Sequence, residues 1–140
     1  MQLQKHGKKL INGEQNNFGN TSIHIDYFRK TDKANSRLIA LFDEGYNFNI
    51  SAITHYEIYS GATSIQLPFW TSLFVRTNVL ALDQDVAQAA VDINNIIKRK
   101  RKQIGMADLF IAATAISNNL SLATFNIKHF DCIDGLRVVE

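Results

Sequence analysis

The sequence predicts a single globular α/β domain with a mostly parallel sheet, and three observations support this prediction. From Asn47 onward, short apolar runs alternate with segments whose apolar residues recur at helical spacing. The 140 residues are 46% hydrophobic and 20% charged, as in an ordinary globular domain. No repeat or linker divides the chain. We therefore expect a single domain over residues 18–140, after a poorly ordered or irregular segment over residues 1–17.

Helices are expected in four places beyond an amphipathic helix that follows Asn20 and carries Asp26. The first runs from Lys33 to Glu44 and stops at Gly45. Residues 62–76 are expected to be helical although Pro68 interrupts them. The clearest helix carries an apolar stripe at i, i+4, i+7 and i+11, formed by Val86, Ala90, Ile93 and Ile97. A further helix follows Gly105, with a face formed by Leu109, Ala113, Ile116 and Leu120.

Strands are expected where short apolar runs lie between turn or cap residues, at 48–53, 78–82, 120–125 and 136–139. A first strand is hard to place, because Gln, Asn, Gly and Lys dominate the first 19 residues. Only Leu10, Ile11 and Phe18 could anchor a strand there. The aromatic residues Phe69, Trp70 and Phe74 are interpreted as core or as an apolar partner-binding face rather than as a base-stacking platform.

Charge and cysteine content narrow the function classes. The net charge is only +2, so bulk charge does not indicate a nucleic-acid binder. Positive charge is concentrated in one run, which is either a solvated helix end or a phosphate-contact patch: Lys98, Arg99, Lys100, Arg101 and Lys102. Cys132 is the only cysteine, and no apolar stretch has the length of a signal peptide or a membrane span, so a cytoplasmic protein is expected.

Polar residues follow several expected strands. Carboxylates placed there point into the crevice where open α/β sheets bind ligands. Each candidate also has a structural interpretation. Thr54 and Glu57 have capping-box spacing, Asp108 is favoured near a helix start by the dipole, and Asp26 could be a solvated helix residue. Asn126 and His129 could form a turn. The spacings are long, so these residues form a site only if the fold brings the strand ends together.

Other catalytic classes have little support. The four histidines show no pair at zinc-ligand spacing. A Gly-x-Ser-x-Gly motif is absent from the sequence, and so is a Gly-rich phosphate loop. A phosphatase or receiver-like domain would need a nucleophilic Asp at the end of the first strand, where Asn20 stands.

Four segments resemble motifs of the PIN-domain ribonucleases, and most closely of the VapC-type toxins of toxin–antitoxin modules. They are "NTSIHIDYFRK", "ISAITHYEIYSG", "IGMADLFIAATAISNNLSLATFNIKHF" and "IDGLRVV". The resemblance covers about residues 18 to 139, and its third segment is the most specific. It implies a PIN-like three-layer α/β/α domain with acids at the C-terminal ends of the strands.

The same resemblance implies a Mg²⁺- or Mn²⁺-dependent endoribonuclease, a homodimer or higher assembly, and a cognate antitoxin that blocks the site. Carried over to this sequence, Glu57 and Asp108 match the catalytic, metal-binding acids. Asn126 stands where the family has Asp or Asn, and Asn20 stands where it has Asp. The motifs also imply supporting positions at Thr21, Ser22, Thr54 and Thr124. Asp26 lies near the first of these motifs and is counted as a further supporting residue.

Asn20 departs from the family pattern. One charge pair at about 4 Å and an effective dielectric of about 20 corresponds to roughly 4 kcal/mol as a ceiling, and half of that would weaken metal binding by more than about tenfold. The chain is therefore expected to be a weakened or inactive nuclease. Three explanations stay open: a deliberate change, natural decay of the site, or partial replacement of the charge by Asp26.

A rival hypothesis is a catalytically inactive, PIN-like binding module that sequesters an antitoxin or RNA. It would bind a partner helix in an apolar groove lined by residues such as Phe42, Tyr56, Tyr59 or Phe69.

Overall fold

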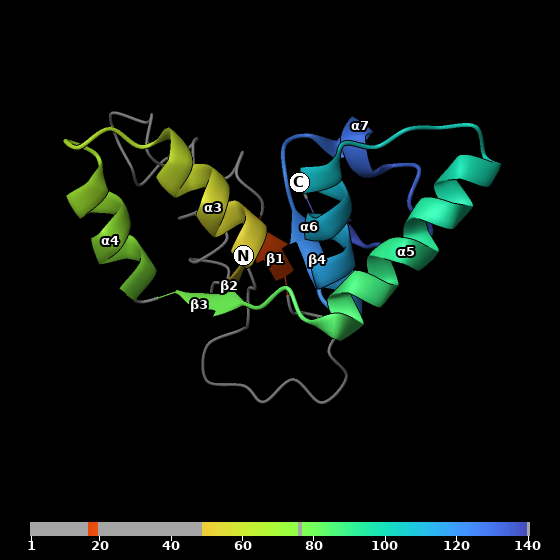
Figure 1. Cartoon of the computed structure of the whole chain (residues 1–140), viewed down its shortest axis with the longest axis horizontal. Coiled ribbons are helices and arrows are strands. Elements are labelled where there is room, and N and C mark those ends of the chain that lie inside the picture. The colour runs from red at the N-terminus through yellow and green to blue at the C-terminus, as the bar shows by residue number, and fades with distance from the viewer. Residues whose placement is uncertain (1–16, 20–48, 76, 140) are drawn as a thin grey trace.

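Five short strands form one parallel sheet in the computed structural model, which describes residues 17–19 (backbone), 49–75 and 77–139 (Figure 1). The strand order is β3-β2-β1-β4-β5, and every pairing is parallel. The α/β class with a parallel sheet is thus confirmed. The strands are β1 (Asn17–Gly19), β2 (Asn49–Ser51), β3 (Asn78–Leu80), β4 (Ser121–Ala123) and β5 (Val138–Val139).

The strand at the centre of the sheet is the one that the sequence hardly indicated. β1 begins at Asn17 and pairs with both β2 and β4, with Gly19 opposite Ile50 and Ala123. Phe18 pairs with Leu122 in this strand. The other strands are shorter than expected, and each covers only part of its predicted range, 48–53, 78–82, 120–125 or 136–139.

The strand predicted over 48–53 is too long at its C-terminal end. Ser51 is the N-cap of α3 (Ala52–Gly61), and its Oγ accepts a hydrogen bond of 2.9 Å from the Thr54 backbone N–H. This cap ends the strand and starts the helix, so Ile53 is helical. It also makes the capping-box interpretation of Thr54 and Glu57 wrong, because Thr54 already lies in the first turn of α3.

A reciprocal capping pair is instead present just before α4 (Leu67–Val75). The Thr63 N–H donates to Gln66 Oε1 at 3.0 Å, and the Gln66 N–H donates to Thr63 Oγ1 at 3.3 Å. Pro68 then lies in the first helical turn, where a missing N–H costs little. The helix expected over 62–76 is confirmed for Leu67–Val75, and residue 76 lies outside the described part of the chain.

The helix predicted from 3.6-residue periodicity is α5 (Gln84–Arg99). Asp83 caps it by accepting from the Val86 N–H at 2.9 Å. The four residues of the expected stripe are buried, which confirms the prediction: Val86, Ala90, Ile93 and Ile97.

α6 (Met106–Ser117) begins after Gly105 as expected, but a single apolar face does not describe it. Its residues 111–115 are all buried, because the helix packs against α5, α3 and β4. Leu120, predicted on the helical face, lies beyond the helix end. Asn119 has φ 55°, and the Leu120 N–H bonds to the Ala115 carbonyl at 2.8 Å, as in a Schellman motif that turns the chain into β4.

Two apolar clusters fill the interior of the described part of the chain. One joins α5, α6, β4 and the short helix α7 (Ile127–Phe130), with Ile97, Ile111 and Phe130 among its most buried members. The other joins β2, α3, α4 and the end of β4 through Ile50, Ile58, Trp70, Phe74 and Ala123. Trp70 and Phe74 are therefore core residues, as predicted.

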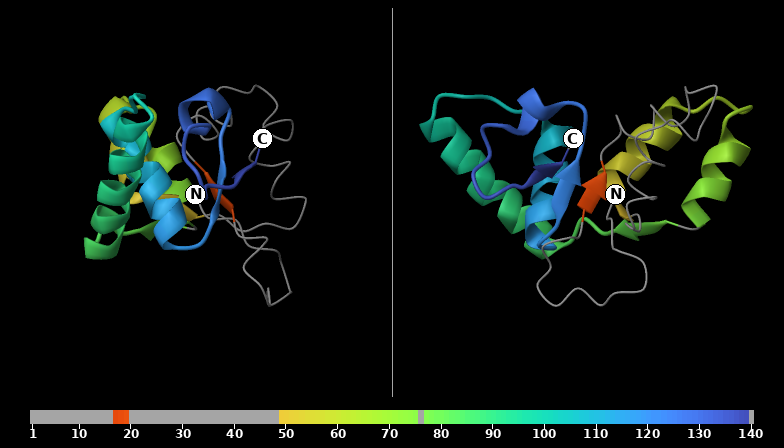
Figure 2. Two further views of the ribbon diagram at one scale, coloured as in Figure 1. Left: turned by 90° about the vertical axis from the view of Figure 1, so that its right-hand side faces the viewer. Right: turned by 180° about the vertical axis from the view of Figure 1, so that it is seen from behind.

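The described helices cover the sheet unevenly. In the edge-on view of Figure 2 (left), α3, α5 and α6 lie on one side of β1 and β4. The helix predicted from Lys33 to Glu44 falls outside the described residues, as does the segment over residues 1–16. Among the helices that are described, none has the length and hydropathy needed to cross a membrane.

Candidate metal and RNA site

The parallel sheet places the C-terminal ends of β1, β2 and β4 at one edge. Gly19, Ser51 and Ala123 are the last residues of these strands, and the register sets Gly19 opposite Ala123. Asn20 directly follows Gly19 in the sequence. Four positions of the predicted site nevertheless lie outside the described residues: Asn20, Thr21, Ser22 and Asp26.

Glu57 lies on α3, between the buried residues Thr54 and Ile58, and its side chain is half-buried. α3 contacts α6, the helix that carries Asp108. In the sequence, α4, β3 and α5 separate these two acids. Only the fold therefore brings the two helices that carry the predicted acids into contact.

Asp108 lies in the first turn of α6, three residues after the N-cap Gly105. Its side chain is 26% exposed, and its Oδ2 lies 3.0 Å from Nδ1 of His129, which belongs to α7. Because an ionised carboxylate can only accept, the ring N–H of His129 is the donor in this contact. Asp108 in the first turn of α6 is favoured by the helix dipole, which agrees with its purely structural interpretation. Its contact with His129, however, also links this carboxylate to a second helix.

The turn after β4 is built by Thr124 and Asn126. Thr124 is buried, and its Oγ1 accepts a hydrogen bond of 2.9 Å from the Asn126 backbone N–H. Asn126 is exposed and is the N-cap residue of α7, but its side chain makes no capping hydrogen bond to that helix. Thr54 is also buried, and its hydroxyl oxygen accepts from Ser51 Oγ at 3.1 Å. Thr124 thus fixes the backbone at Asn126, and Thr54 supports the Ser51 cap of α3, the helix that carries Glu57.

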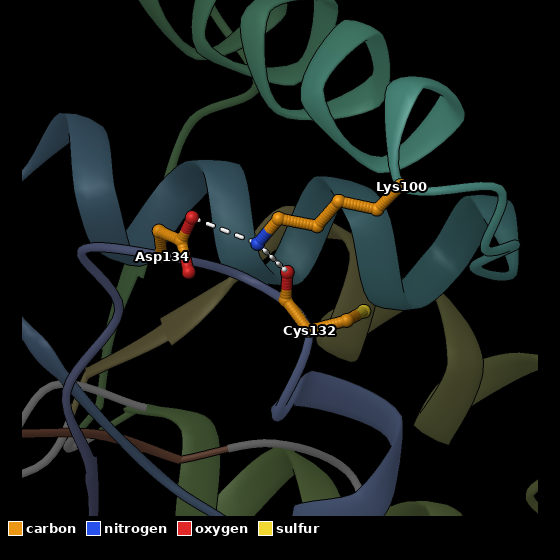
Figure 3. A network of polar contacts seen from close by, with 3 residues as sticks. All are labelled: Lys100, Cys132 and Asp134. Atoms are coloured by element: carbon orange, nitrogen blue, oxygen red, sulfur yellow. Dashed lines mark hydrogen bonds and ion pairs between the residues drawn. The ribbon is translucent and has the colours of Figure 1, made fainter.

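The basic run is divided by the end of α5. Lys98 and Arg99 form the last helical turn, where they complement the helix dipole. Arg101 has φ 57°, and the Lys102 N–H bonds to the Ile97 carbonyl at 3.1 Å, which completes a second Schellman motif. Lys100 Nζ contacts Asp134 Oδ2 at 2.8 Å and the Cys132 carbonyl at 3.4 Å (Figure 3).

A pocket of about 620 Å³ lies between the α5–α6 connection and α7. Asp108 and His129 both line it, together with Lys102 from the end of the basic run and Lys128 from α7. The sequence did not identify this pocket. The sequence patterns predict a turn role for His129 and no zinc site. The signal for a role in the site is that His129 stands three residues after the candidate ligand Asn126, in the short helix that Asn126 precedes.

Within the described ranges, no group of three or more His, Cys, Asp and Glu side chains is arranged to hold a metal ion. The predicted ligand set contributes only two acids, Glu57 and Asp108, to that part of the chain. Its other members are Asn126, an amide, and Asn20, which is not described.

Comparison with known proteins gives matches over most of the chain. A model of the PIN domain matches residues 20–136. Ribonuclease VapC1 of Methanocaldococcus jannaschii is 32% identical over 141 residues, which cover 99% of this chain and 97% of that protein. The structure of VapBC-1 from nontypeable Haemophilus influenzae aligns with a TM-score of 0.75 at 26% identity, over 89% of this chain and 96% of the other. A toxin–antitoxin complex from Klebsiella pneumoniae aligns with a TM-score of 0.67 at 30% identity, over 88% and 95%.

Proposed function

The chain belongs to the PIN-domain family, and on that premise we propose that it is a VapC-like endoribonuclease toxin that depends on Mg²⁺ or Mn²⁺ and is weakened by Asn20. The observation that carries this proposal is the family match over residues 20–136. A relative named as a ribonuclease, similar over nearly the whole length of both chains, supports RNA as the substrate.

The donor set fits a hard divalent cation. Mg²⁺ and Mn²⁺ prefer oxygen ligands, and Mg²⁺ usually keeps several waters, which suits a few partly exposed side chains. Asp108 offers a partly exposed carboxylate whose second oxygen is not used in the contact with His129. Glu57 lies on the helix that contacts α6. We propose that these acids hold the ion with amide oxygens of Asn20 and Asn126.

A bound ion supplies a water of lowered pKa and neutralises charge on the phosphate. The chain's own residues orient the site. His129 holds the Asp108 carboxylate by its N–H, and Thr124 fixes the turn that presents Asn126. Thr21 and Ser22 would support the first turn, as in the family motif, and Asp26 would replace part of the charge that Asn20 lacks.

The test compares the parent chain with Asn20→Asp and Asp108→Ala. Mg²⁺ and Mn²⁺ are titrated by calorimetry, and cleavage of several RNAs is followed in the same preparations. We expect Asn20→Asp to bind metal more than about tenfold more tightly, because a unit charge is restored, and to cleave faster. Asp108→Ala should abolish cleavage. Equal metal affinity and equal cleavage by the parent and Asn20→Asp would contradict a metal role for position 20.

An antitoxin partner is proposed because a similar structure is a toxin–antitoxin complex. We also propose a homodimer in the cytoplasm, where a reducing environment suits the one buried thiol, Cys132. Copurification with a coexpressed candidate antitoxin tests the partner, and measurement of the mass in solution tests the homodimer.

A second candidate is a catalytically inactive module that sequesters an antitoxin or RNA, and the observation that favours it is Asn20. Tyr56 is 68% exposed on α3, whereas Tyr59 and Phe69 pack against the cluster of Trp70 and Phe74. Phe42, the fourth residue of the expected groove, lies outside the described residues. This candidate predicts partner binding that is independent of Mg²⁺ and Mn²⁺, and no RNA cleavage even by Asn20→Asp.

A further inference from the structure

The pocket between the α5–α6 connection and α7 opens beside the proposed metal ligand Asp108. Figure 1 shows the connection running from the end of α5 across to the start of α6, with α7 next to that start. The volume of the pocket, about 620 Å³, is in the range of small-ligand sites. The polar side chains that line it are Lys102, Gln103, Asp108, Lys128, His129 and Asp131.

Two lysines line this pocket from different elements. Lys102 follows the left-handed residue Arg101, so the Schellman motif turns it away from the axis of α5. Lys128 belongs to α7. Neither lysine forms an ion pair with any residue in the described ranges, whereas Lys100 is engaged by Asp134 and by the Cys132 carbonyl (Figure 3).

The charge balance of the pocket depends on the metal. Asp131 contributes one negative charge and Asp108 a second, so the two lysines are balanced when no cation is present. A divalent cation held by Asp108 and Glu57 would offset these two carboxylates and leave Asp131 opposite the two lysines, so the pocket would be positive. An anion is then the favoured occupant, and Lys is a common phosphate binder.

We propose that this pocket binds a phosphodiester of single-stranded RNA next to the one that is cleaved, with Lys102 and Lys128 as the phosphate contacts. The inference rests on the proposed function, since the RNA strand must pass Asp108. This inference limits the predicted phosphate-contact patch to one residue of the run Lys98–Lys102, namely Lys102, and adds Lys128 to it.

The experiment measures binding of a short fluorescent single-stranded RNA over a range of salt concentrations. The parent chain is used, Mg²⁺ is present or chelated, and a gel run after each titration checks that the RNA is still intact. The pocket variant is Lys102→Gln with Lys128→Gln. The matched control is Lys98→Gln with Arg99→Gln, which removes the same charge from the last turn of α5.

Each phosphate contact on a single strand contributes about 0.7 to the slope of log affinity against log salt. The pocket variant should therefore lower the slope by about 1.4 in the presence of Mg²⁺, and by less after chelation, while the control stays close to the parent. An equal or larger loss in the control would overturn the proposal in favour of a diffuse patch. An unchanged slope in the pocket variant, with loss of antitoxin binding instead, would identify a protein contact and overturn it too.

A second readout separates this proposal from the proposed function. In the Asn20→Asp background, the pocket variant should raise KM for RNA cleavage more than it lowers kcat. If Asn20→Asp cleaves RNA and the pocket variant has the same KM, the pocket proposal alone fails. If no variant cleaves RNA while the slope still falls, the proposed nuclease function fails and the phosphate site stands.

Discussion

Replacement of His129 by Ala tests how the Asp108 carboxylate is held. The contact joins His129 Nδ1 to Asp108 Oδ2 at 3.0 Å, and the side chains are 58% and 26% exposed. A hydrogen bond to a charged group contributes about 1.5–3 kcal/mol, but water can replace part of this one because the histidine is exposed. We therefore expect the loss of this hydrogen bond to cost about 1 kcal/mol, which lowers metal affinity roughly fivefold. This lies just below the range of about 10–100-fold for removing a partner of a metal ligand.

The assay is calorimetric titration of Mn²⁺ in the Asn20→Asp background, with thermal unfolding of each variant as a check on the fold. The matched variant His129→Gln keeps a side-chain N–H and should recover much of the affinity. Because His129 also packs near Phe130, with ring centroids 6.5 Å apart, an equal loss in both variants would assign the effect to ring packing. Unchanged affinity in His129→Ala would refute the positioning role.

Other variants test the site and its frame. Glu57→Gln should abolish RNA cleavage by Asn20→Asp, with thermal unfolding as the check on the fold, and retained cleavage would remove Glu57 from the site. Ser51→Ala should lower the free energy of unfolding by about 1–2 kcal/mol, because the Thr54 N–H loses its acceptor; urea unfolding measures this. Arg101→Gly should raise the free energy of unfolding by up to about 1 kcal/mol, since glycine adopts φ 57° without strain. Lys100→Met should cost less than about 1 kcal/mol, and less still at high salt, because its contact with Asp134 is exposed.

The sequence predicted best where one rule acts alone. α5 is long, amphipathic and capped, so its stripe is buried as periodicity indicates. The helix after Gly105 was placed correctly, and Leu109, Ala113 and Ile116 of its predicted face lie in or against the core. The buried surface is wider than that face, because residues 111–115 are all buried. Periodicity cannot describe a helical segment that has no solvent face.

Strand ends were predicted less well because side-chain caps decide them. Ala52 and Ile53 continue the apolar run of β2, yet the Ser51 cap makes them helical. β1 was nearly invisible, since pairing with β2 and β4 on both sides, rather than local propensity, makes a strand of Asn17–Gly19.

The candidate site was predicted through resemblance rather than from spacing. α3 and α6 are in contact, and a shared site for Glu57 and Asp108 stays a prediction. The contact between His129 and Asp108 could not be foreseen, because it depends on how α7 packs against the start of α6.

The location of β1 has a practical consequence for any shortened form of the protein. This strand joins the half of the sheet made by β2 and β3 to the half made by β4 and β5, and it precedes both halves in the sequence. A form that started at residue 20 would leave two half-sheets with unpaired inner edges, each open to association with another chain. Aggregation of such a shortened form would then be caused by the loss of β1, not by instability of either half of the sheet.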